Sequence, residues 1–343
     1  MPVTILDIAK ASGKSYPTVS RALNNHPKIS AETTARIKKI ASEMGYRPSF
    51  AGRMLQSGKT NIIGVIVPQL TNPVYAKFAS AIKERALLES YDTVVYDFEL
   101  NPELERSYLD KMLTRCCDGL ITSLSSFEHT GDIFSKLWET RVPCVIFGPP
   151  LNDTGIKYDA ILGKAPSTSA LGHLIDYGHR NIIVATGFLP EELLGVRIKG
   201  YFAEFKKHGL EFVPENNLRC SAMTSGCLAE DGWLCGKKIF SKPLNATAIV
   251  CVNDYFAFGV MRAALDAGLK IPDDISIVAC DNIWVSKYSP IPLTTIDQNL
   301  DKVAEKALNL IFKRLKNKNW QTPERITVQG KLIIRESTGK LKK

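Results

Sequence analysis

The amino-acid sequence predicts an α/β protein in which a small helical head precedes a larger body of doubly wound parallel sheets. The chain has 343 residues, which at about 100–200 residues per domain is enough for two or three folded units. From Ile62 onward, short apolar runs alternate with amphipathic stretches, whereas residues 1–60 show helical spacing only. Residues 1–60 carry a net charge of +7, and the other 283 residues carry +2 of the total of +9. A basic head is typical of a surface that meets a polyanion, although a solvated basic face gives the same count.

The head is predicted to begin with two short helices joined by a tight turn. Thr4 and Asp7 form a capping box at the start of the first helix, and Gly13 supplies the left-handed residue that ends it. Ser15 is predicted to cap a second helix that runs to about Leu23. Such a pair is a helix-turn-helix, whose second helix enters the major groove of DNA. Its outward side chains are candidates for base or phosphate contact: Tyr16, Thr18 and Arg21.

A third helix is predicted from Ser30 to Gly45, with Ile37, Ile40 and Ala41 on its apolar face. Three helices with this spacing fit any small bundle, so the pattern alone also allows a head that does not bind DNA. The charge of +7 on residues 1–60 favours the helix-turn-helix.

The body is predicted to contain two parallel sheets. Its apolar runs lie at residues 62–67, 93–98, 119–122, 143–147, 182–185, 247–252, 275–279 and 293–296, with helical stretches between them. Apolar strands that alternate with helices indicate sheets covered by helices on both faces, and such sheets bind ligands beyond the carboxyl ends of their strands. Two sheets fit the length, which predicts two lobes with a cleft between them.

The sequence gives little support for metal binding, disulfides or catalysis. The eight cysteines form no C-x-x-C pair and several lie in apolar runs, so we expect buried free thiols, with zinc or disulfides less favoured. The tripeptides at residues 13–15 and 58–60 lack the earlier glycine of a phosphate-binding loop, because Ile8 and Arg53 stand there. No G-x-G-x-x-G follows a strand, and the five histidines lack zinc-hydrolase spacing. We therefore expect no enzyme, no catalytic residue, no metal and no cofactor.

The composition is that of a globular chain, with 45% hydrophobic and 23% charged residues. No apolar run approaches the about 18–20 residues that a membrane-spanning helix needs. The amino terminus lacks the basic and apolar segments of a secretion signal. We expect a cytoplasmic protein without a membrane partner.

Three ordered motifs in the head carry a family resemblance. Residues 4–13 (TILDIAKASG), 18–24 (TVSRALN) and 45–48 (GYRP) together resemble the amino-terminal signature of the LacI (lactose-repressor) family. The resemblance implies a headpiece that reads a near-palindromic operator in double-stranded DNA as a homodimer. It also implies DNA-binding roles for eight head residues, namely Thr4, Ser15, Tyr16, Pro17, Thr18, Ser20, Arg21 and Asn24. Lys14 and Pro17 depart from the family pattern, so the operator sequence does not carry over.

Residues 48–61 resemble the family's hinge helix, which folds on binding DNA. Leu55 matches the leucine that is levered into the minor groove, where an apolar wedge kinks the duplex, and Arg53 would lie beside it near a phosphate. Gly52 stands where the family favours Ala, which lowers helix stability by about 1 kcal/mol. The alternative is a flexible linker with one incidental leucine.

The resemblance extends through the body, with landmarks such as residues 178–180 (GHR), 253–254 (ND) and 271–276 (IPDDIS). It implies the fold of periplasmic sugar-binding proteins, in which two lobes joined by three crossovers, near 160, 290 and 322, hold a small-molecule effector between them. Six positions match the family's effector contacts: Tyr75, Ser123, Arg197, Asn253, Asp281 and Gln298. Gly148, Ser221 and residues 161–164 depart from the contacts of sugar-binding members.

The sequence therefore predicts an effector-controlled transcriptional repressor made of four parts. We expect a helix-turn-helix domain at residues 1–47, a hinge at 48–61, a first lobe at 62–160 with 290–321, and a second lobe at 161–289 with 322–339. The effector is expected to be a sugar or sugar derivative. The alternative is a solute-binding protein with the same body and no DNA-linked regulation, which the basic head and the missing secretion signal count against.

Overall fold

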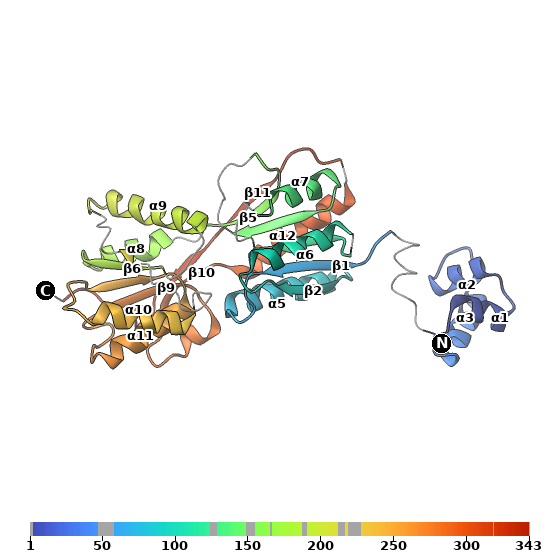
Figure 1. The fold of residues 1–343 in the computed structure, drawn as a ribbon. Helices are drawn as coiled ribbons and strands as arrows, with labels where there is room; N and C mark the ends of the chain where they lie inside the picture. The colour runs from blue at the N-terminus through green and yellow to red at the C-terminus, as the bar shows by residue number, and fades with distance from the viewer. Residues whose placement is uncertain are drawn as a thin grey trace. The chain divides into compact units, whose positions relative to one another are not determined.

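The computed structural model describes residues 3–46, 58–114, 116–123, 129–148, 155–164, 167–186, 191–211, 217–218, 228–317 and 319–342 (Figure 1). The chain divides into two compact units, Met1–Thr60 and Asn61–Lys343. The predicted hinge contacts Arg53 and Leu55 lie outside the described residues.

The head consists of three helices, as predicted: α1 (Ile5–Ser12), α2 (Tyr16–Leu23) and α3 (Ala31–Glu43). The capping box at the start of α1 is present, because the backbone N–H of Thr4 donates to Asp7 Oδ2 at 2.9 Å and that of Asp7 donates to Thr4 Oγ1 at 3.4 Å. Gly13 has a φ of 65°, the left-handed conformation that turns the chain toward α2. The three helices enclose a small core made of Ile8, Val19, Ala22, Ile37 and Ala41.

The body contains two six-stranded sheets, which confirms the predicted doubly wound α/β class. In the first sheet the strand order is β11 (Arg325–Gln329), β5 (Asp159–Lys164), β4 (Cys144–Gly148), β3 (Gly119–Thr122), β1 (Ile62–Val67) and β2 (Asp92–Asp97). In the second the order is β12 (Lys331–Ile333), β10 (Thr294–Asp297), β9 (Ser276–Asp281), β8 (Ala248–Cys251), β6 (Ile182–Ala185) and β7 (Asn217–Leu218). All neighbouring strands are parallel except β10 and β12.

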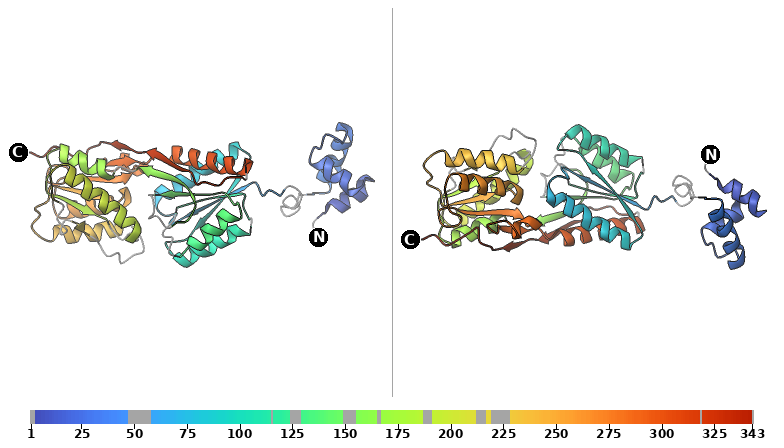
Figure 2. Two further views of the ribbon diagram at one scale, coloured as in Figure 1. Left: turned by 90° about the horizontal axis from the view of Figure 1, so that it is seen from above. Right: turned by 90° about the horizontal axis from the view of Figure 1, so that it is seen from below.

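Helices cover both faces of each sheet (Figures 1 and 2). The first sheet packs against α5 (Pro73–Leu88) and α12 (Leu300–Lys316) on one side, and against α6 (Pro102–Leu113) and α7 (Gly131–Glu139) on the other. The second sheet packs against α10 (Ala229–Phe240) and α11 (Asp254–Asp266) on one side, and against α8 (Ser167–Asp176) and α9 (Glu191–Lys207) on the other. Four apolar cores result, two in each lobe.

The chain crosses between the sheets a few residues later than the sequence indicated. β5 pairs with β4 from Asp159 to Leu162, so this strand completes the first sheet although residues from 161 were expected in the second lobe. β10 pairs with β9 of the second sheet, and β11 pairs with β5 of the first, each opposite to the expected lobe. The residue patterns of these strands are compatible with either sheet, so only the observed pairing decides to which lobe each strand belongs.

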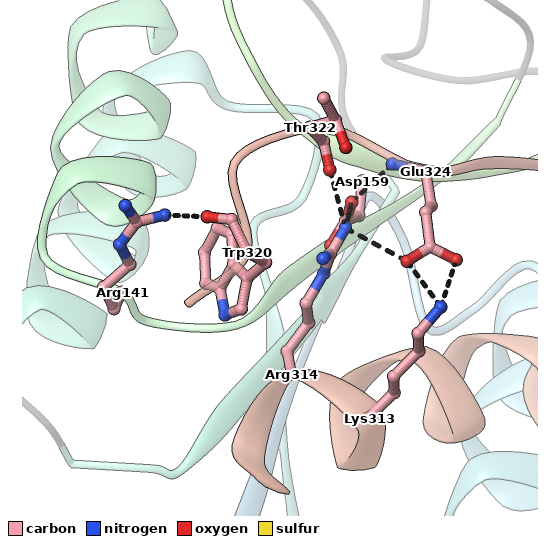
Figure 3. A network of polar contacts seen from close by, with 7 residues as sticks. All are labelled: Arg141, Asp159, Lys313, Arg314, Trp320, Thr322 and Glu324. Atoms are coloured by element: carbon pink, nitrogen blue, oxygen red, sulfur yellow. Dashed lines mark hydrogen bonds and ion pairs between the residues drawn. The ribbon is translucent and has the colours of Figure 1, made fainter. Parts of the chain in front are cut away.

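A buried polar network joins three of the segments next to these crossovers (Figure 3). Arg314 near the end of α12 donates to both carboxylate oxygens of Asp159 at the start of β5, at 2.7 and 2.8 Å. The backbone N–H of Glu324, just before β11, donates to Asp159 Oδ1 at 2.8 Å. Trp320 lies against the Arg314 guanidinium, 4.9 Å from its ring centroid, and excludes water from the ion pair.

Among the cysteines that the structure describes, five are free thiols, and four of these are buried, as expected: Cys117, Cys144, Cys251 and Cys280. Cys116 is half-buried. Cys235 departs from the expectation of free thiols, because it takes part in a disulfide. Among the described helices, none combines the length and apolar character needed to cross a membrane.

Candidate functional site

The second helix of the head presents one face to its core and the other to solvent. Val19 and Ala22 are fully buried. Tyr16 is 45% exposed, Arg21 and Asn24 are exposed, and Pro17 is exposed within the first turn, where a missing N–H leaves no partner unsatisfied. Thr18 and Ser20 are half-buried. Tyr16, Pro17 and Arg21 therefore form the exposed outer face of α2, and the half-buried Thr18 and Ser20 lie at its border with the core.

Two of the predicted DNA contacts also organise the helix starts. The Thr4 hydroxyl donates to Asp7 Oδ2 at 2.7 Å, which holds the pKa of that carboxyl below its ordinary value. Ser15 is the residue before α2, as predicted, but its hydroxyl does not cap the backbone. It is hydrogen bonded instead to the Thr18 hydroxyl at 2.9 Å, so Ser15 positions a residue of the outer face.

The described part of the head is strongly basic at its surface. Seven exposed side chains carry positive charge, namely Lys10, Lys14, Arg21, Lys28, Arg36, Lys38 and Lys39. Only the Lys39–Glu43 contact, at 3.9 Å, forms an ion pair within residues 3–46. This surface is suited to neutralising phosphates along a nucleic-acid backbone.

In the body, two predicted effector contacts meet at the carboxyl edge of the second sheet. Asp281 ends β9 and is 6% exposed, and Gln298 directly follows the neighbouring strand β10. The side-chain amide of Gln298 donates to Asp281 Oδ1 at 2.5 Å. Carboxylate oxygens are strong acceptors for hydroxyl donors, so this edge of the sheet is chemically suited to a hydroxylated ligand.

The other four predicted effector contacts lie on or next to four different elements. Asn253 lies at the end of β8, but its Oδ1 accepts from the backbone of Phe256 at 2.7 Å and caps α11. Tyr75 lies in the first turn of α5, half-buried against the first-lobe core, and Ser123 is buried just after β3. Arg197 lies in α9, and its side chain lies outside the described residues.

A cavity of about 440 Å³ opens between α5 of the first lobe and the segment that follows Asp281 in the second. It is lined by Pro73, Lys77, Asn282, Ile283, Trp284, Lys287, Tyr288 and Arg335. None of these residues is among the six predicted contacts, although Asn282 adjoins Asp281. A signal was present in the sequence, because aromatic and basic residues at 284–288 follow directly on a strand end at which ligands bind.

Asp254 fixes the segment that forms one wall of this cavity. Its carboxylate is fully buried and accepts hydrogen bonds from the backbone of Ile283 at 3.0 Å and from the hydroxyls of Ser286 and Thr295. Burial raises the pKa of Asp254 to about 6, although these hydrogen bonds and Arg335 act in the opposite direction. The carboxylate therefore ties α11, β10 and the cavity wall into one unit.

The guanidinium of Arg335 braces the floor of the cavity. It donates to Asn282 Oδ1 and to the backbone oxygen of Leu293, both at 2.6 Å. The Asn282 amide in turn donates to Asp297 Oδ2 at 3.0 Å. These contacts hold the residue after Asp281 in the left-handed conformation, with a φ of 50° at Asn282.

Two of the positions that depart from the effector contacts of sugar-binding family members, Gly148 and residues 161–164, lie in strands of the first sheet. Gly148 ends β4, and a Cβ added there would meet no heavy atom within 4 Å, so the absent acid leaves open space. Residues 161–164 form the second half of β5, and Ser221 lies outside the described residues.

Two family models match the chain. The model of the bacterial regulatory proteins, lacI family, matches residues 4–49, and that of the periplasmic binding protein-like domain matches residues 171–338.

Curated and solved proteins resemble the chain over most of its length. The HTH-type transcriptional repressor PurR of Pasteurella multocida is 31% identical over 97% of this chain and 98% of its own. The lac repressor dimer bound to operator and an anti-inducer superposes with a TM-score of 0.85 at 23% identity, over 99% of this chain and 100% of that one. A ribose-bound LacI family regulator from Enterococcus faecium superposes over 82% of this chain and 100% of its own, with a TM-score of 0.68 at 22% identity.

Proposed function

The chain belongs to the lacI family of bacterial regulatory proteins, and from that premise we propose how it works. It is a DNA-binding transcriptional repressor with an effector-binding core, and not an enzyme. In our proposal a homodimer binds a near-palindromic operator in double-stranded DNA, and a small molecule held between the two lobes sets the operator affinity.

The observation that carries this proposal is the cavity of about 440 Å³ that both lobes line. Its volume falls in the range of about 300–1,000 Å³ that is usual for small-molecule sites. A ligand that contacts Lys77 on one lobe and Lys287 on the other favours one arrangement of the lobes over others. Ligand binding can shift the operator affinity in this way, because a ligand that binds one arrangement of the lobes more tightly than another increases the population of that arrangement.

For the head, we propose that α2 enters the major groove with Tyr16, Thr18 and Arg21 toward the base edges. Thr4, Ser15, Pro17, Ser20 and Asn24 complete the DNA-facing set in this proposal. Arg53 and Leu55 of the hinge, residues 48–61, contact the centre of the operator, with Leu55 as an apolar wedge in the minor groove.

For the body, we propose that Asp281 and Gln298 bind the hydroxyl groups of a sugar or sugar derivative. The 2.5 Å contact between these two side chains at the carboxyl edge of the second sheet supports this. The ribose-bound regulator from Enterococcus faecium, which shares this fold, gives independent support for a sugar-type ligand. Tyr75, Ser123, Arg197 and Asn253 complete the proposed set.

Selection of DNA from a random duplex library by the full chain tests this function. We expect a near-palindromic consensus of two half-sites and one dimer per duplex, because each head of a symmetric dimer reads one half-site. A ligand-binding chain without an operator, which is the solute-binding alternative, would enrich no sequence above the input library. That outcome would contradict the proposal.

A further inference from the structure

The walls of the inter-lobe cavity carry a charge that the proposed sugar site does not explain. Three of its lining residues are cationic, namely Lys77, Lys287 and Arg335, and none is a carboxylate. Lys77 belongs to α5 of the first lobe, whereas Lys287 belongs to η2 (Trp284–Lys287) of the second. Positive charge therefore faces the cavity from both lobes.

We propose that the effector is a phosphate monoester of a small hydroxylated ring compound, with its phosphate between Lys77 and Lys287. This inference rests on the proposed function, since it names the chemical class of ligand for the same inter-lobe site. A phosphate monoester carries nearly two negative charges at neutral pH, so one such group can balance both lysines. Charge-assisted hydrogen bonds from ammonium groups to phosphate oxygens are among the strongest polar contacts in proteins.

The neighbouring acidic groups are already engaged within the protein. Asp254 accepts three hydrogen bonds, Asp281 accepts one from Gln298, and Asp297 accepts from Asn282 and from the backbone of Asn299. Burial lowers the pKa of Arg335, while the nearby carboxylates of Asp254 and Asp297 favour its charged form and so accompany that guanidinium as counter-charges. Within the part of the chain that the structure describes, no ion pair involves Lys77 or Lys287, and both side chains are exposed.

Two aromatic side chains at the same cavity supply a surface for the ring of the ligand. Trp284 is 73% exposed and Tyr288 is 70% exposed, although side chains of this size are usually largely buried. Both lie on the segment that Asp254 holds in place, and the ammonium of Lys287 is 5.3 Å from the ring centroid of Tyr288. An aromatic ring and a lysine ammonium are thus neighbours at this cavity, and Asn282, which also lines it, directly follows Asp281.

Matched pairs of ligands test the proposal in the full chain by isothermal titration calorimetry. The probes are ribose and ribose 5-phosphate, glucose and glucose 6-phosphate, and fructose and fructose 6-phosphate, with gluconate as a carboxylate and inorganic phosphate alone. We expect at least one phosphate ester to bind about tenfold or more tightly than its neutral partner and than gluconate. Quenching of Trp284 fluorescence should follow the same isotherm and be lost in Trp284→Phe.

Substitution of the two lysines identifies the phosphate site. Lys77→Met with Lys287→Met should reduce the affinity for the ester to that for its neutral partner. The matched control, Lys83→Met with Lys242→Met, removes one exposed lysine from α5 and one from the second lobe outside the cavity, and should leave the affinity unchanged. Thermal unfolding of both double variants should match that of the unmodified chain, because all four lysines are exposed.

Three results would overturn the inference: equal affinity for neutral and phosphorylated partners, no loss in the Lys77/Lys287 variant, or no binding by any ester. Selection of an operator by the full chain, carried out both without ligand and with each probe, reports on the proposed function separately. If an operator is selected and a neutral sugar alone changes its affinity, the function stands and the phosphate inference fails.

Discussion

At the scale of single residues, we propose that the outer face of α2 selects the DNA sequence. Arg21 is exposed there, and its planar fork can bind a guanine edge through two hydrogen bonds. Val19 and Ala22 fix the opposite face in the head core, so the orientation of Arg21 follows from packing.

Arg21→Ala should weaken operator binding by about 1–3 kcal/mol if the side chain reads a base. Fluorescence anisotropy with the selected operator and with random duplex DNA measures this loss. Arg36→Ala, which removes an exposed arginine from α3, is the matched control and should weaken operator binding less than Arg21→Ala does. Equal losses on operator and random DNA would assign Arg21 to a phosphate instead.

Asp254 should make the stability of the body depend on pH. Its pKa is raised to about 6 in the folded chain, above the ordinary value of 3.8, mainly by burial. Folding thus favours the protonated form of the Asp254 carboxyl. The resulting stabilisation of the folded chain is fully present below about pH 4 and is lost as the pH rises through about 6. Between pH 4 and pH 7 the loss amounts to about 3 kcal/mol.

Asp254→Asn removes this titration. As the pH rises from about 4 to about 7, the free energy of unfolding of the variant should therefore increase relative to that of the unmodified chain. Urea unfolding at a series of pH values measures the difference. Asp301→Asn changes an exposed carboxyl at the start of α12 and should show no such trend. A difference between Asp254→Asn and the unmodified chain that does not vary with pH would contradict the raised pKa.

The family resemblance singled out Asp281 and Gln298. They meet in the structure because Asp281 ends β9 and Gln298 follows the adjacent strand β10. Lys77 and Trp284 come from different lobes, and only the folded path of the chain brings them to one cavity. The role of Asp254 was not predicted because its three donors lie far along the chain, at residues 283–295.

At the scale of elements, glycines allow α10 and α11 to pack in direct backbone contact. A Cβ added at Gly259 would lie 1.8 Å from the backbone oxygen of Ala229, and one added at Gly232 would lie 1.9 Å from that of Phe256. Since both obstacles are backbone atoms, neither clash can be relieved by a side-chain rotation.

Gly259→Ala should therefore destabilise the body by about 3 kcal/mol or more, because the two helices must separate. Chemical denaturation followed by circular dichroism gives this value. Gly148→Ala, at a position with open space around the added methyl group, should change stability little. Equal stability of the two variants would refute the close approach of the helices.

The network around Arg314 holds the end of α12 and the start of β5 together (Figure 3). The side chains of Arg314 and Asp159 are 6% and 2% exposed. Arg314→Met leaves the Asp159 carboxylate buried without its cation and should lower the free energy of unfolding by about 3–5 kcal/mol.

Adding Asp159→Asn to Arg314→Met should restore part of this loss, because the unpaired charge is then removed. A double-mutant cycle by urea unfolding measures the coupling between the two side chains. Strictly additive losses would show that the ion pair does not couple α12 to β5.

Elements were predicted better than their assignment to lobes. The apolar runs at 62–67, 182–185 and 275–279 and the capping box at Thr4 report local physics, so the strands and α1 appear where expected. The membership of β10 and β11 depends on long-range pairing, which periodicity does not encode.

At the scale of the whole molecule, charge separates the DNA-binding head from the body. Residues 1–60 carry +7 of the total of +9, and the described cations of the head are exposed. The body is nearly neutral. The two exposed lysines that line its cavity come one from each lobe. One end of the chain is therefore suited to a polyanion, and the cavity to a small anion.

Operator affinity measured against salt concentration, for the full chain and for residues 61–343, tests the central claim that the head binds DNA. With about six or more phosphates neutralised per dimer, the affinity of the full chain should fall about 10³-fold or more between 50 and 200 mM salt. Residues 61–343, which contain all four apolar cores of the body, should unfold cooperatively yet bind no operator. Retained operator binding by residues 61–343, or an affinity of the full chain that does not depend on salt, would contradict the account.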